Sequence, residues 1–316
     1  MNQPVPGGPW ITGASGFVGR RLFRRLLDSG ERHAVALSGV QPAEFSGIGA
    51  RRWLKFRIGD LTPELFQEFQ LLSGETHAVY HLAGMANPRL CEQHPKDARI
   101  ANLEHSTRLF EFATEHGFPV LFASTAGVYR PSAQSHAETD PLEPRGVYGQ
   151  TKLEAEGAAR EAVASGARIV IARAFNHSGP GQFTDYALPA FASKLASARG
   201  NDEPIEVGNL EAVRDFLHVD DVLDAYQLLI DEGESGSAYN VCSGFGVSMG
   251  ELYERMGARF GFSPAELAQR TRPAPEAARP KDPDVLVGDP AKLVALGWRP
   301  RRSLDELIDD IARPLL

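Results

Sequence analysis

A glycine-rich turn near the N-terminus constrains the fold of this chain more than any other feature. Gly13, Gly16 and Gly19 stand three residues apart between a short apolar run, Pro9 to Ile11, and an amphipathic segment, Phe17 to Ser29. The apolar run predicts a buried strand, and the amphipathic segment predicts a helix. Glycine permits a tight turn with close backbone approach, and the first turn of the helix offers N–H groups and a partial positive charge to an anion. The turn therefore predicts a cradle for the pyrophosphate of a dinucleotide.

Strand and helix patterns keep alternating through the first 175 residues. Further strands are expected at 33–38, 53–58, 78–83, 120–124 and 168–173, and helices at 98–116 and 149–165. Such alternation favours an α/β fold with a parallel sheet wound on both faces, whose ligands bind at the carboxyl ends of the strands. We expect a doubly wound Rossmann sheet in a dinucleotide-binding domain at 1–175, with returns near 210–242, and a smaller, mainly C-terminal substrate-binding subdomain at 176–316.

The alternation stops at residues 176–182, where two glycines and a proline predict a loop that faces the ligand crevice. Beyond this loop, 188–198 and 219–229 have helical patterns, and 205–207 has a strand pattern. Residues 270–283 are rich in arginine and proline, so we expect a loop there that a ligand orders.

Composition excludes several classes of function. A net charge of −8 argues against a nucleic-acid or anionic-membrane partner, and the chain has no run of about 18 apolar residues to span a membrane. The polar N-terminus lacks the pattern of a signal peptide. Two cysteines, Cys91 and Cys242, cannot build a disulfide framework, and no His, Cys or Asp grouping has metal-ligand spacing. We therefore expect a cytoplasmic protein without a metal.

Tyr148 and Lys152 lie one helical turn apart at the start of the helix expected at 149–165. On a shared face, the ammonium stabilises a phenolate and lowers the pKa of the tyrosine from about 10, so the tyrosine can exchange a proton near neutral pH. By chance this spacing occurs in roughly one such chain in ten. The spacing of Tyr148 and Lys152 indicates a catalytic pair because a glycine-rich turn precedes it in the chain.

Ser38 stands at the end of the second expected strand, where folds that prefer NAD place an acidic residue against the ribose hydroxyls. Because no acid is there to repel a 2′-phosphate, the sequence favours NADP. No arginine adjoins Ser38, and a neutral residue also tolerates NAD.

These features together resemble the short-chain dehydrogenase/reductase superfamily, in its extended branch of nucleotide-sugar enzymes. The resemblance implies that Asp60 and Leu61 hold the adenine and that residues 81–84 run beneath the cofactor. It also assigns the catalytic Ser/Thr to Thr125, whose hydroxyl donates to the substrate oxygen as charge develops there. The predicted cofactor-binding residues are Gly13, Gly16, Phe17, Val18, Gly19, Ser38, Asp60, Leu61, Leu82, Ala83, Gly84, Tyr148, Lys152 and Phe175.

Dehydratases of this branch carry an acidic residue after the catalytic threonine, where this chain has Ala126 and Gly127. Neither residue can transfer a proton, so dehydration is disfavoured, which leaves 4-keto reduction or 4-epimerisation. The mannose-series reductases often carry acids at these positions too, so the sugar pocket of this chain differs beside the reacting carbon.

Three longer strings, at 173–182, 207–216 and 239–244, closely resemble those of GDP-6-deoxy-4-keto-mannose reductases, which make GDP-rhamnose. By that resemblance Asn176 orients the sugar, cationic side chains meet the diphosphate, and Val207 lies near the base. Arginines suit this task because they bind phosphate oxygens by paired, charge-assisted hydrogen bonds. The predicted substrate-binding residues are Thr125, Ala126, Tyr148, Asn176, Lys194, Val207, Arg214 and Arg279.

The sequence thus predicts an NADPH-dependent 4-ketoreductase of a GDP-6-deoxy sugar, with Tyr148 as the acid and Thr125 and Lys152 as its partners. A 4-epimerase with tightly bound NAD is the nearest alternative, and a non-catalytic NADP-binding protein is a third. The resemblance also implies a homodimer that pairs the helices at 98–116 and 149–165 with their copies.

Overall fold

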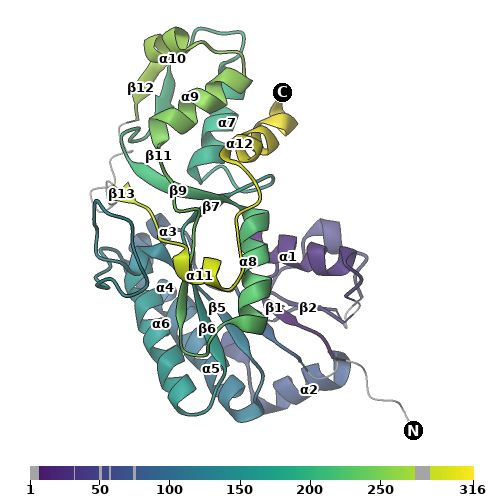
Figure 1. Ribbon diagram of the computed structural model, residues 1–316. Helices are drawn as coiled ribbons and strands as arrows, with labels where there is room; N and C mark the ends of the chain where they lie inside the picture. The colour runs from purple at the N-terminus through teal and green to yellow at the C-terminus, as the bar shows by residue number, and fades with distance from the viewer. Residues whose placement is uncertain (1–6, 32, 50–51, 57, 74–75, 275–284) are drawn as a thin grey trace. The chain divides into compact units, whose positions relative to one another are not determined.

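The computed structural model describes residues 7–31, 33–49, 52–56, 58–73, 76–274 and 285–316 (Figure 1). The chain divides into two compact units. The first unit comprises Met1–Val128, Leu142–Arg173 and Ala225–Tyr239, and the second comprises Tyr129–Pro141, Ala174–Asp224 and Asn240–Leu316.

A seven-stranded sheet forms the centre of the first unit. Its order is β10-β6-β5-β4-β1-β2-β3, and the pairs β1–β2, β1–β4, β2–β3 and β4–β5 are parallel. The strands are β1 (Trp10–Thr12), β2 (Val35–Leu37), β3 (Trp53–Leu54), β4 (Val79–His81), β5 (Val120–Thr125), β6 (Ile169–Ala174) and β10 (Ala238–Val241). The order reverses between β1 and β4, and in open α/β sheets the carboxyl ends at such a reversal form the ligand crevice. The predicted doubly wound α/β fold is confirmed.

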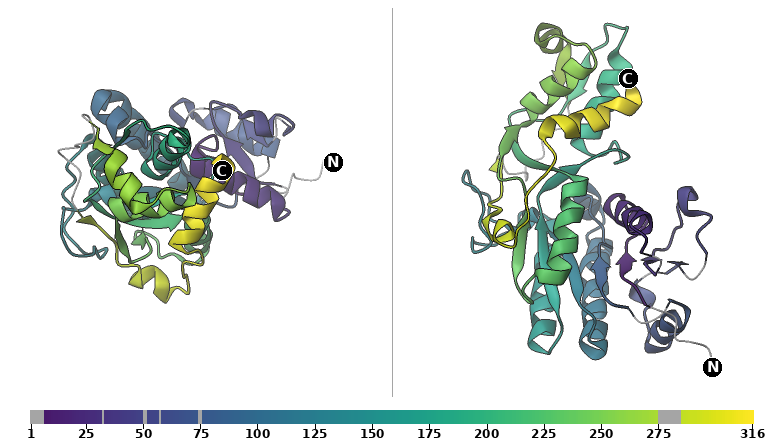
Figure 2. Two further views of the ribbon diagram at one scale, coloured as in Figure 1. Left: turned by 90° about the horizontal axis from the view of Figure 1, so that it is seen from above. Right: turned by 45° about the vertical axis from the view of Figure 1, so that its right-hand side comes forward.

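Helices cover both faces of this sheet. They are α1 (Phe17–Asp28), α2 (Pro63–Ser73), α3 (Pro88–Gln93), α4 (Pro95–Arg99), α5 (His105–His116), α6 (Val147–Ala164) and the second half of α8 (Val219–Glu232). Alternate strand residues, such as Val120 and Phe122, share a buried core with α2, α5 and α6. On the other face, α1 and α8 are joined by a hydrogen bond from Arg25 Nη1 to Gln227 Oε1, at 3.2 Å. Figure 2 shows α5 and α6 lying side by side.

Local structure departs from the expectations at three places. The helix expected at 98–116 is interrupted by a π-helical turn, Ile100–Glu104, because the buried Asn102 side chain is held by backbone groups outside the helix. Among the described residues of the strand expected at 53–58, Trp53–Leu54 form the strand, and Ile58 already begins a short helical turn. Residues 176–178 are not irregular: they form β7 (Asn176–Ser178), which pairs with β9 (Val213–His218), because Gly179 and Pro180 interrupt the chain only after them.

The second unit contains two smaller sheets. In one of them β9 pairs antiparallel with β11 (Gly246–Ser248) and parallel with β13 (Val285–Leu286) and β7, and in the other β8 (Ile205–Val207) pairs with β12 (Thr271–Pro273). Its helices are α7 (Ala187–Ala198), α9 (Met249–Arg259), α10 (Pro264–Arg270), α11 (Ala291–Ala295) and α12 (Leu304–Ala312). The core of this unit lies between α7, α9 and α12. Ser263 and Ser303 form capping boxes that begin α10 and α12.

Candidate functional site

The glycine-rich turn holds the ends of β1 and β4 close together. Gly13 has a φ of +69°, and a Cβ added there would lie 2.7 Å from the backbone nitrogen of Ala83. A Cβ on Gly19 would lie 2.3 Å from the carbonyl oxygen of Gly13. Only glycine permits this packing, so α1 starts directly against the turn.

The N-terminus of α1 suits a pyrophosphate. Gly16 is the N-cap residue and supplies no side chain to the first N–H groups, and the first turn contains no acidic residue. The helix dipole and these N–H groups therefore favour an anion. The predicted residues Gly16, Phe17 and Val18 are all at least partly exposed here, so the turn fits the group for which it was predicted.

A directional chain of buried hydrogen bonds fixes the crevice beside this turn. The Ala83 N–H donates to Thr12 Oγ1 at 3.2 Å, and Thr12 Oγ1 lies 2.8 Å from His81 Nδ1. On the other side of the ring, His81 Nε2 lies 2.9 Å from Ser106 Oγ, which donates to the carbonyl oxygen of Asn102. Because the Ser106 hydroxyl donates to the Asn102 carbonyl oxygen, Ser106 Oγ accepts from His81 Nε2–H. His81 Nδ1 therefore accepts from the Thr12 hydroxyl.

His81 is therefore a neutral structural residue. Its imidazole is fully buried, and burial lowers its pKa to about 3, with the charges of Lys152 and His105 acting in the same direction. Both nitrogens of its ring have hydrogen-bond partners, Thr12 and Ser106. Leu82, Ala83 and Gly84 follow it at the end of β4, and a Cβ on Gly84 would meet Asn102 Oδ1 at 2.6 Å.

Ser38 stands at the end of β2 and contacts the glycine-rich turn. Its hydroxyl donates to Ser15 Oγ at 2.7 Å, and the residue is almost fully buried. The neighbouring Gly39 and Val40 are exposed, and neither has a charged side chain that could face a ribose. Asp60 is exposed at the end of a short helical turn, whereas Leu61 is buried and its carbonyl oxygen accepts from Arg108.

Lys152 lies at the centre of the predicted catalytic group. Its side chain is 5% exposed, and Nζ donates to the carbonyl oxygen of Ala123, at 2.8 Å, over the ring of Phe122. Burial lowers the pKa of Lys152 to about 8, against an opposite effect of the Glu156 carboxylate. This contact ties α6 to β5, two residues before Thr125.

Thr125 ends β5 and is half-buried. Its Oγ1 accepts from the Gly127 N–H at 3.1 Å, and a hydroxyl oxygen that accepts in this way keeps its own hydrogen for donation. Ala126 is buried in the helical turn that follows. A Cβ on Gly149 would lie 2.3 Å from the Gly127 carbonyl oxygen, so the first turn of α6 packs directly on this segment.

Tyr148 is half-buried in that same first turn, one turn before Lys152. Its carbonyl oxygen accepts from Thr151 Oγ1 at 3.0 Å, and Thr151 Oγ1 accepts from Asn102 Nδ2 at 3.1 Å. Across from it, burial raises the pKa of Tyr226, and the charge of Tyr148 adds to that effect. The start of α6, which bears Tyr148 and Lys152, thus packs against the end of β5 beside Thr125, and a Cβ on Gly84 would lie 3.7 Å from Lys152 Nζ.

The remaining predicted residues belong to the second unit. Phe175 is buried, and its N–H donates to the carbonyl oxygen of Val241. Asn176 lies in β7 and is half-buried. Val207 is 2% exposed in the core of this unit, so its side chain is enclosed by protein.

The predicted cationic residues differ in exposure. Arg214, in β9, is almost fully buried, and its Nη1 donates to the carbonyl oxygen of Val213 at 2.9 Å. Lys194 is exposed on α7, and its Nζ donates to the carbonyl oxygen of Glu206 at 2.6 Å. Arg279 lies outside the described residues.

Sequence reasoning missed two buried residues beside the catalytic group. Asn102 bonds both backbone groups of Met85 as well as Thr151, and Glu156 bonds Ser124 and Arg173. Asn102 resembles any polar residue in a helical run. Glu156 is four residues after Lys152, a spacing that usually indicates a surface ion pair.

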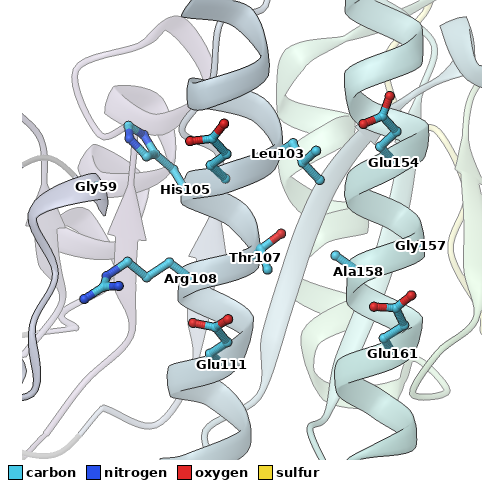
Figure 3. A pocket seen from close by; sticks show the side chains of 11 residues that line it. Gly59, Leu103, His105, Thr107, Arg108, Glu111, Glu154, Gly157, Ala158 and Glu161 are labelled. Atoms are coloured by element: carbon cyan, nitrogen blue, oxygen red, sulfur yellow. The ribbon is translucent and has the colours of Figure 1, made fainter.

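A groove of about 730 Å³ lies on the outer surface of the first unit, away from the glycine-rich turn. It runs between α5 and α6, and the carboxylates of Glu111 and Glu161 project from its two sides (Figure 3). Leu103, Gly157 and Ala158 supply its apolar and small surfaces. Its lining includes none of the predicted catalytic or binding residues, so we assign no chemistry to it.

Membrane-spanning helices and metal-ligand clusters are absent from the described residues. Within them no helix is long and apolar enough to cross a membrane. Over the same part of the chain, no cluster of three or more His, Cys, Asp or Glu side chains is arranged to hold a metal ion.

Comparison with known proteins reveals related sequences. The model of the NAD dependent epimerase/dehydratase family matches residues 10–242. GDP-6-deoxy-D-mannose reductase of Pseudomonas aeruginosa is 31% identical over 315 residues, which cover 95% of this chain and 96% of that protein. UDP-glucose 4-epimerase of Bacillus subtilis is 28% identical over 95% of this chain and 94% of its own length.

Solved structures agree with these matches. RMD from Pseudomonas aeruginosa complexed with NADPH has a TM-score of 0.76 at 28% identity, covering 98% of this chain and 99% of that one. UDP-glucose 4-epimerase of Thermus thermophilus in complex with NAD has a TM-score of 0.82 at 25% identity, with 98% of both chains covered. The cofactors in these two complexes are the two that the sequence predicted.

Proposed function

Because this chain belongs to the NAD dependent epimerase/dehydratase family, we propose that it is an NADPH-dependent 4-ketoreductase of a nucleotide sugar. The substrate we infer is GDP-4-keto-6-deoxy-D-mannose, and the product is GDP-D-rhamnose. The single observation that carries the proposal is the group Thr125, Tyr148 and Lys152, which lies beside a turn built for a pyrophosphate and has no acidic residue after the threonine. The 31% identity with a GDP-6-deoxy-D-mannose reductase supports the choice of sugar.

Tyr148 is the general acid in this proposal. As the carbonyl carbon is reduced, its oxygen becomes an alkoxide, and the Tyr148 hydroxyl supplies the proton. Lys152 makes the phenol more acidic, because an ammonium one helical turn away stabilises the phenolate. Thr125 donates its hydroxyl hydrogen to the same oxygen, and this bond strengthens as negative charge builds, which lowers the barrier.

The cofactor is proposed to bind at the carboxyl ends of β1, β2 and β4. Gly13, Gly16 and Gly19 leave room for the pyrophosphate, and the first turn of α1 provides N–H donors to it. Ser38 and Ser15 offer hydroxyls without an acidic side chain, which favours a 2′-phosphate. A nicotinamide bound there supplies the hydride.

The residues of the second unit are proposed to recognise the nucleotide diphosphate. Arg214, Lys194 and Arg279 carry positive charge in a chain whose net charge is −8. Such cations bind diphosphate oxygens by charge-assisted hydrogen bonds. Asn176 is proposed to orient the sugar, Phe175 to lie by the nicotinamide, and Val207 to lie near the base.

A nucleotide-sugar 4-epimerase is the second candidate. The Bacillus subtilis and Thermus thermophilus epimerases are nearly as similar to this chain as the reductase is. An epimerase needs the same acid, but its cofactor returns to the starting oxidation state in each cycle. Purified epimerase would therefore carry tightly bound NAD and turn over without added NADPH, which separates the two functions. A non-catalytic NADP-binding protein would consume no NADPH with any keto sugar.

Changing Tyr148 to Phe tests the proposed acid. The substitution removes the phenolic proton and leaves the ring, so kcat should fall by about 10²- to 10⁴-fold while substrate KM changes little. Thr114→Val serves as the control, because its hydroxyl bonds only the Phe110 carbonyl within α5. Near-normal kcat in the Tyr148→Phe enzyme would exclude Tyr148 as the acid.

A further inference from the structure

Glu156 is a buried carboxylate to which the proposed chemistry gives no role. Its side chain is completely enclosed, and each of its oxygens accepts two hydrogen bonds. Oε1 accepts from Ser124 Oγ at 2.7 Å and from Arg173 Nε at 3.0 Å. Oε2 accepts from Arg173 Nη2 at 2.8 Å and from Arg160 Nη2 at 3.0 Å. The carboxylate is thus fully satisfied.

Stability alone does not explain such an arrangement. Arg173 is 1% exposed, so both members of the ion pair have lost their water. Desolvation of two charges offsets most of their attraction, and apolar residues of similar volume often stabilise a core as well or better. The position of the pair indicates what else it does.

The ion pair of Glu156 and Arg173 lies close in the chain, or through Ser124, to the proposed catalytic residues Lys152 and Thr125. Glu156 follows Lys152 by four residues on α6, so the two side chains share a face one turn apart. Ser124 immediately precedes Thr125 on β5, and Arg173 lies on β6. The carboxylate therefore joins the turn after Lys152 to two strands, one of which ends in Thr125.

Two opposing influences act on the charge of Lys152. The ammonium is buried, and burial favours its neutral form, whereas Glu156 favours the cation. Other titratable or charged groups act on Lys152 directly or through Glu156, His81 or Tyr148. They are Cys91 and Glu92 on α3, His81 on β4, His105 on α5, Tyr148 and Arg160 on α6, Arg173 on β6 and Tyr226 on α8. Glu156 is the largest of the influences that favour the cation, and Cys91 is the second.

We propose that Glu156 is a positioning residue that holds the turn bearing Tyr148 and Lys152 against the end of β5 and balances the charge of the Lys152 ammonium one helical turn away. Its effect on turnover rests on the ketoreductase function proposed above, whereas its effect on the charge of Lys152 does not. Without the carboxylate, Lys152 loses its proton at a lower pH, and Tyr148 then reverts to the weak acidity of an ordinary phenol.

The charge of Lys152 can be followed without any substrate. The chain has six lysines, so NMR of protein labelled with ¹³C at the lysine Cε resolves few signals, and the signal that disappears in Lys152→Met is that of Lys152. In Glu156→Gln the titration midpoint of Lys152 should fall by about one pH unit or more. Arg160→Met is the matched control, because Arg160 is 42% exposed and its removal leaves the carboxylate in place. Equal midpoints in Glu156→Gln and wild type would overturn the proposal.

A second variant covers the case in which Glu156→Gln does not fold, since that change leaves Arg173 buried beside a neutral group. The double variant Glu156→Leu with Arg173→Met removes both charges, a replacement that cores tolerate. Removing the Arg173 cation by itself favours the Lys152 cation, so the reference for the double variant is Arg173→Met alone. The midpoint of Lys152 should be lower in the double variant than in Arg173→Met, and equal midpoints in these two variants would contradict the proposal.

Turnover provides a third readout. Because the ammonium acidifies Tyr148, kcat for the 4-keto sugar should decline at a pH lower by the same amount as the midpoint, while Arg160→Met keeps the wild-type profile. A uniformly lower kcat with an unmoved pH profile would show a merely structural role. If wild-type enzyme reduced no 4-keto sugar, the proposed function would fail, and the NMR titration would still decide the role of Glu156.

Discussion

Gly13 allows a quantitative test of how the glycine-rich turn builds the cofactor crevice. Gly13→Ala introduces two costs: a left-handed alanine, at φ +69°, and a Cβ that would lie 2.7 to 2.9 Å from the backbone of Ala83 and Leu82. Gly117→Ala introduces only the first cost, because Gly117 has a φ of +75° and nothing lies within 4 Å of its added Cβ. The difference between the two variants therefore isolates the close approach of β1 to the end of β4.

The expected magnitudes follow from these contacts. A left-handed alanine costs about 1–2 kcal/mol, which both variants share. Overpacking against backbone adds roughly 1–3 kcal/mol in Gly13→Ala alone. Relief of this clash moves Ala83 away from the turn, so the crevice between β1 and β4 widens. A loss of about 1.4 kcal/mol in cofactor binding corresponds to a tenfold weaker Kd.

Two measurements read the result. Urea unfolding should show Gly13→Ala to be less stable than Gly117→Ala, and fluorescence titration should show at least about tenfold weaker NADPH binding for Gly13→Ala alone. If both variants bound NADPH as wild type does, the reasoning about the crevice would be refuted.

Three further predictions concern other parts of the first unit. Ser38→Asp places a carboxylate where a 2′-phosphate is proposed, so the ratio of kcat/KM for NADPH to that for NADH should fall by about tenfold or more, and an unchanged ratio would contradict the NADP preference. His81 has a pKa of about 3 when folded and about 6.5 when unfolded, so between these values the unfolded chain binds the extra proton and stability falls as pH falls. His81→Asn should therefore remove up to about 1.4 kcal/mol per pH unit from the slope of unfolding free energy between pH 6.5 and 5, and an equal slope in both proteins would argue against a neutral buried ring. Gly157→Trp fills open space in the groove between α5 and α6. In sedimentation it should convert the expected dimer to a monomer without weakening NADPH binding, and a persistent dimer would place the interface elsewhere.

The sequence predicted the parallel sheet because its signals are local. The glycine-rich turn, the apolar strands and the amphipathic helix at Phe17–Asp28 each depend on neighbouring residues only. Tyr148 and Lys152 share a face for the same reason, since four residues make one turn of α6. Their role in catalysis remains a prediction.

Features set by distant contacts could not be predicted. The π-helical turn at Ile100–Glu104 accompanies the bonds from Asn102 to Met85 and Thr151, which lie 17 and 49 residues away. Asn176–Ser178 becomes a strand because it pairs with β9 about 40 residues later, in spite of the glycine and proline that follow. Burial of Glu156 likewise depends on Arg173, which a helical pattern in α6 does not reveal.

One incubation tests most directly the proposed reduction of a 4-keto sugar by this protein. The purified protein is mixed with GDP-4-keto-6-deoxy-D-mannose and NADPH, the absorbance of NADPH is followed, and the sugar product is identified by NMR. We predict that one NADPH is consumed per sugar and that GDP-D-rhamnose is the product. Interconversion of a nucleotide sugar with tightly bound NAD and no NADPH consumed, or no reaction at all, would contradict it.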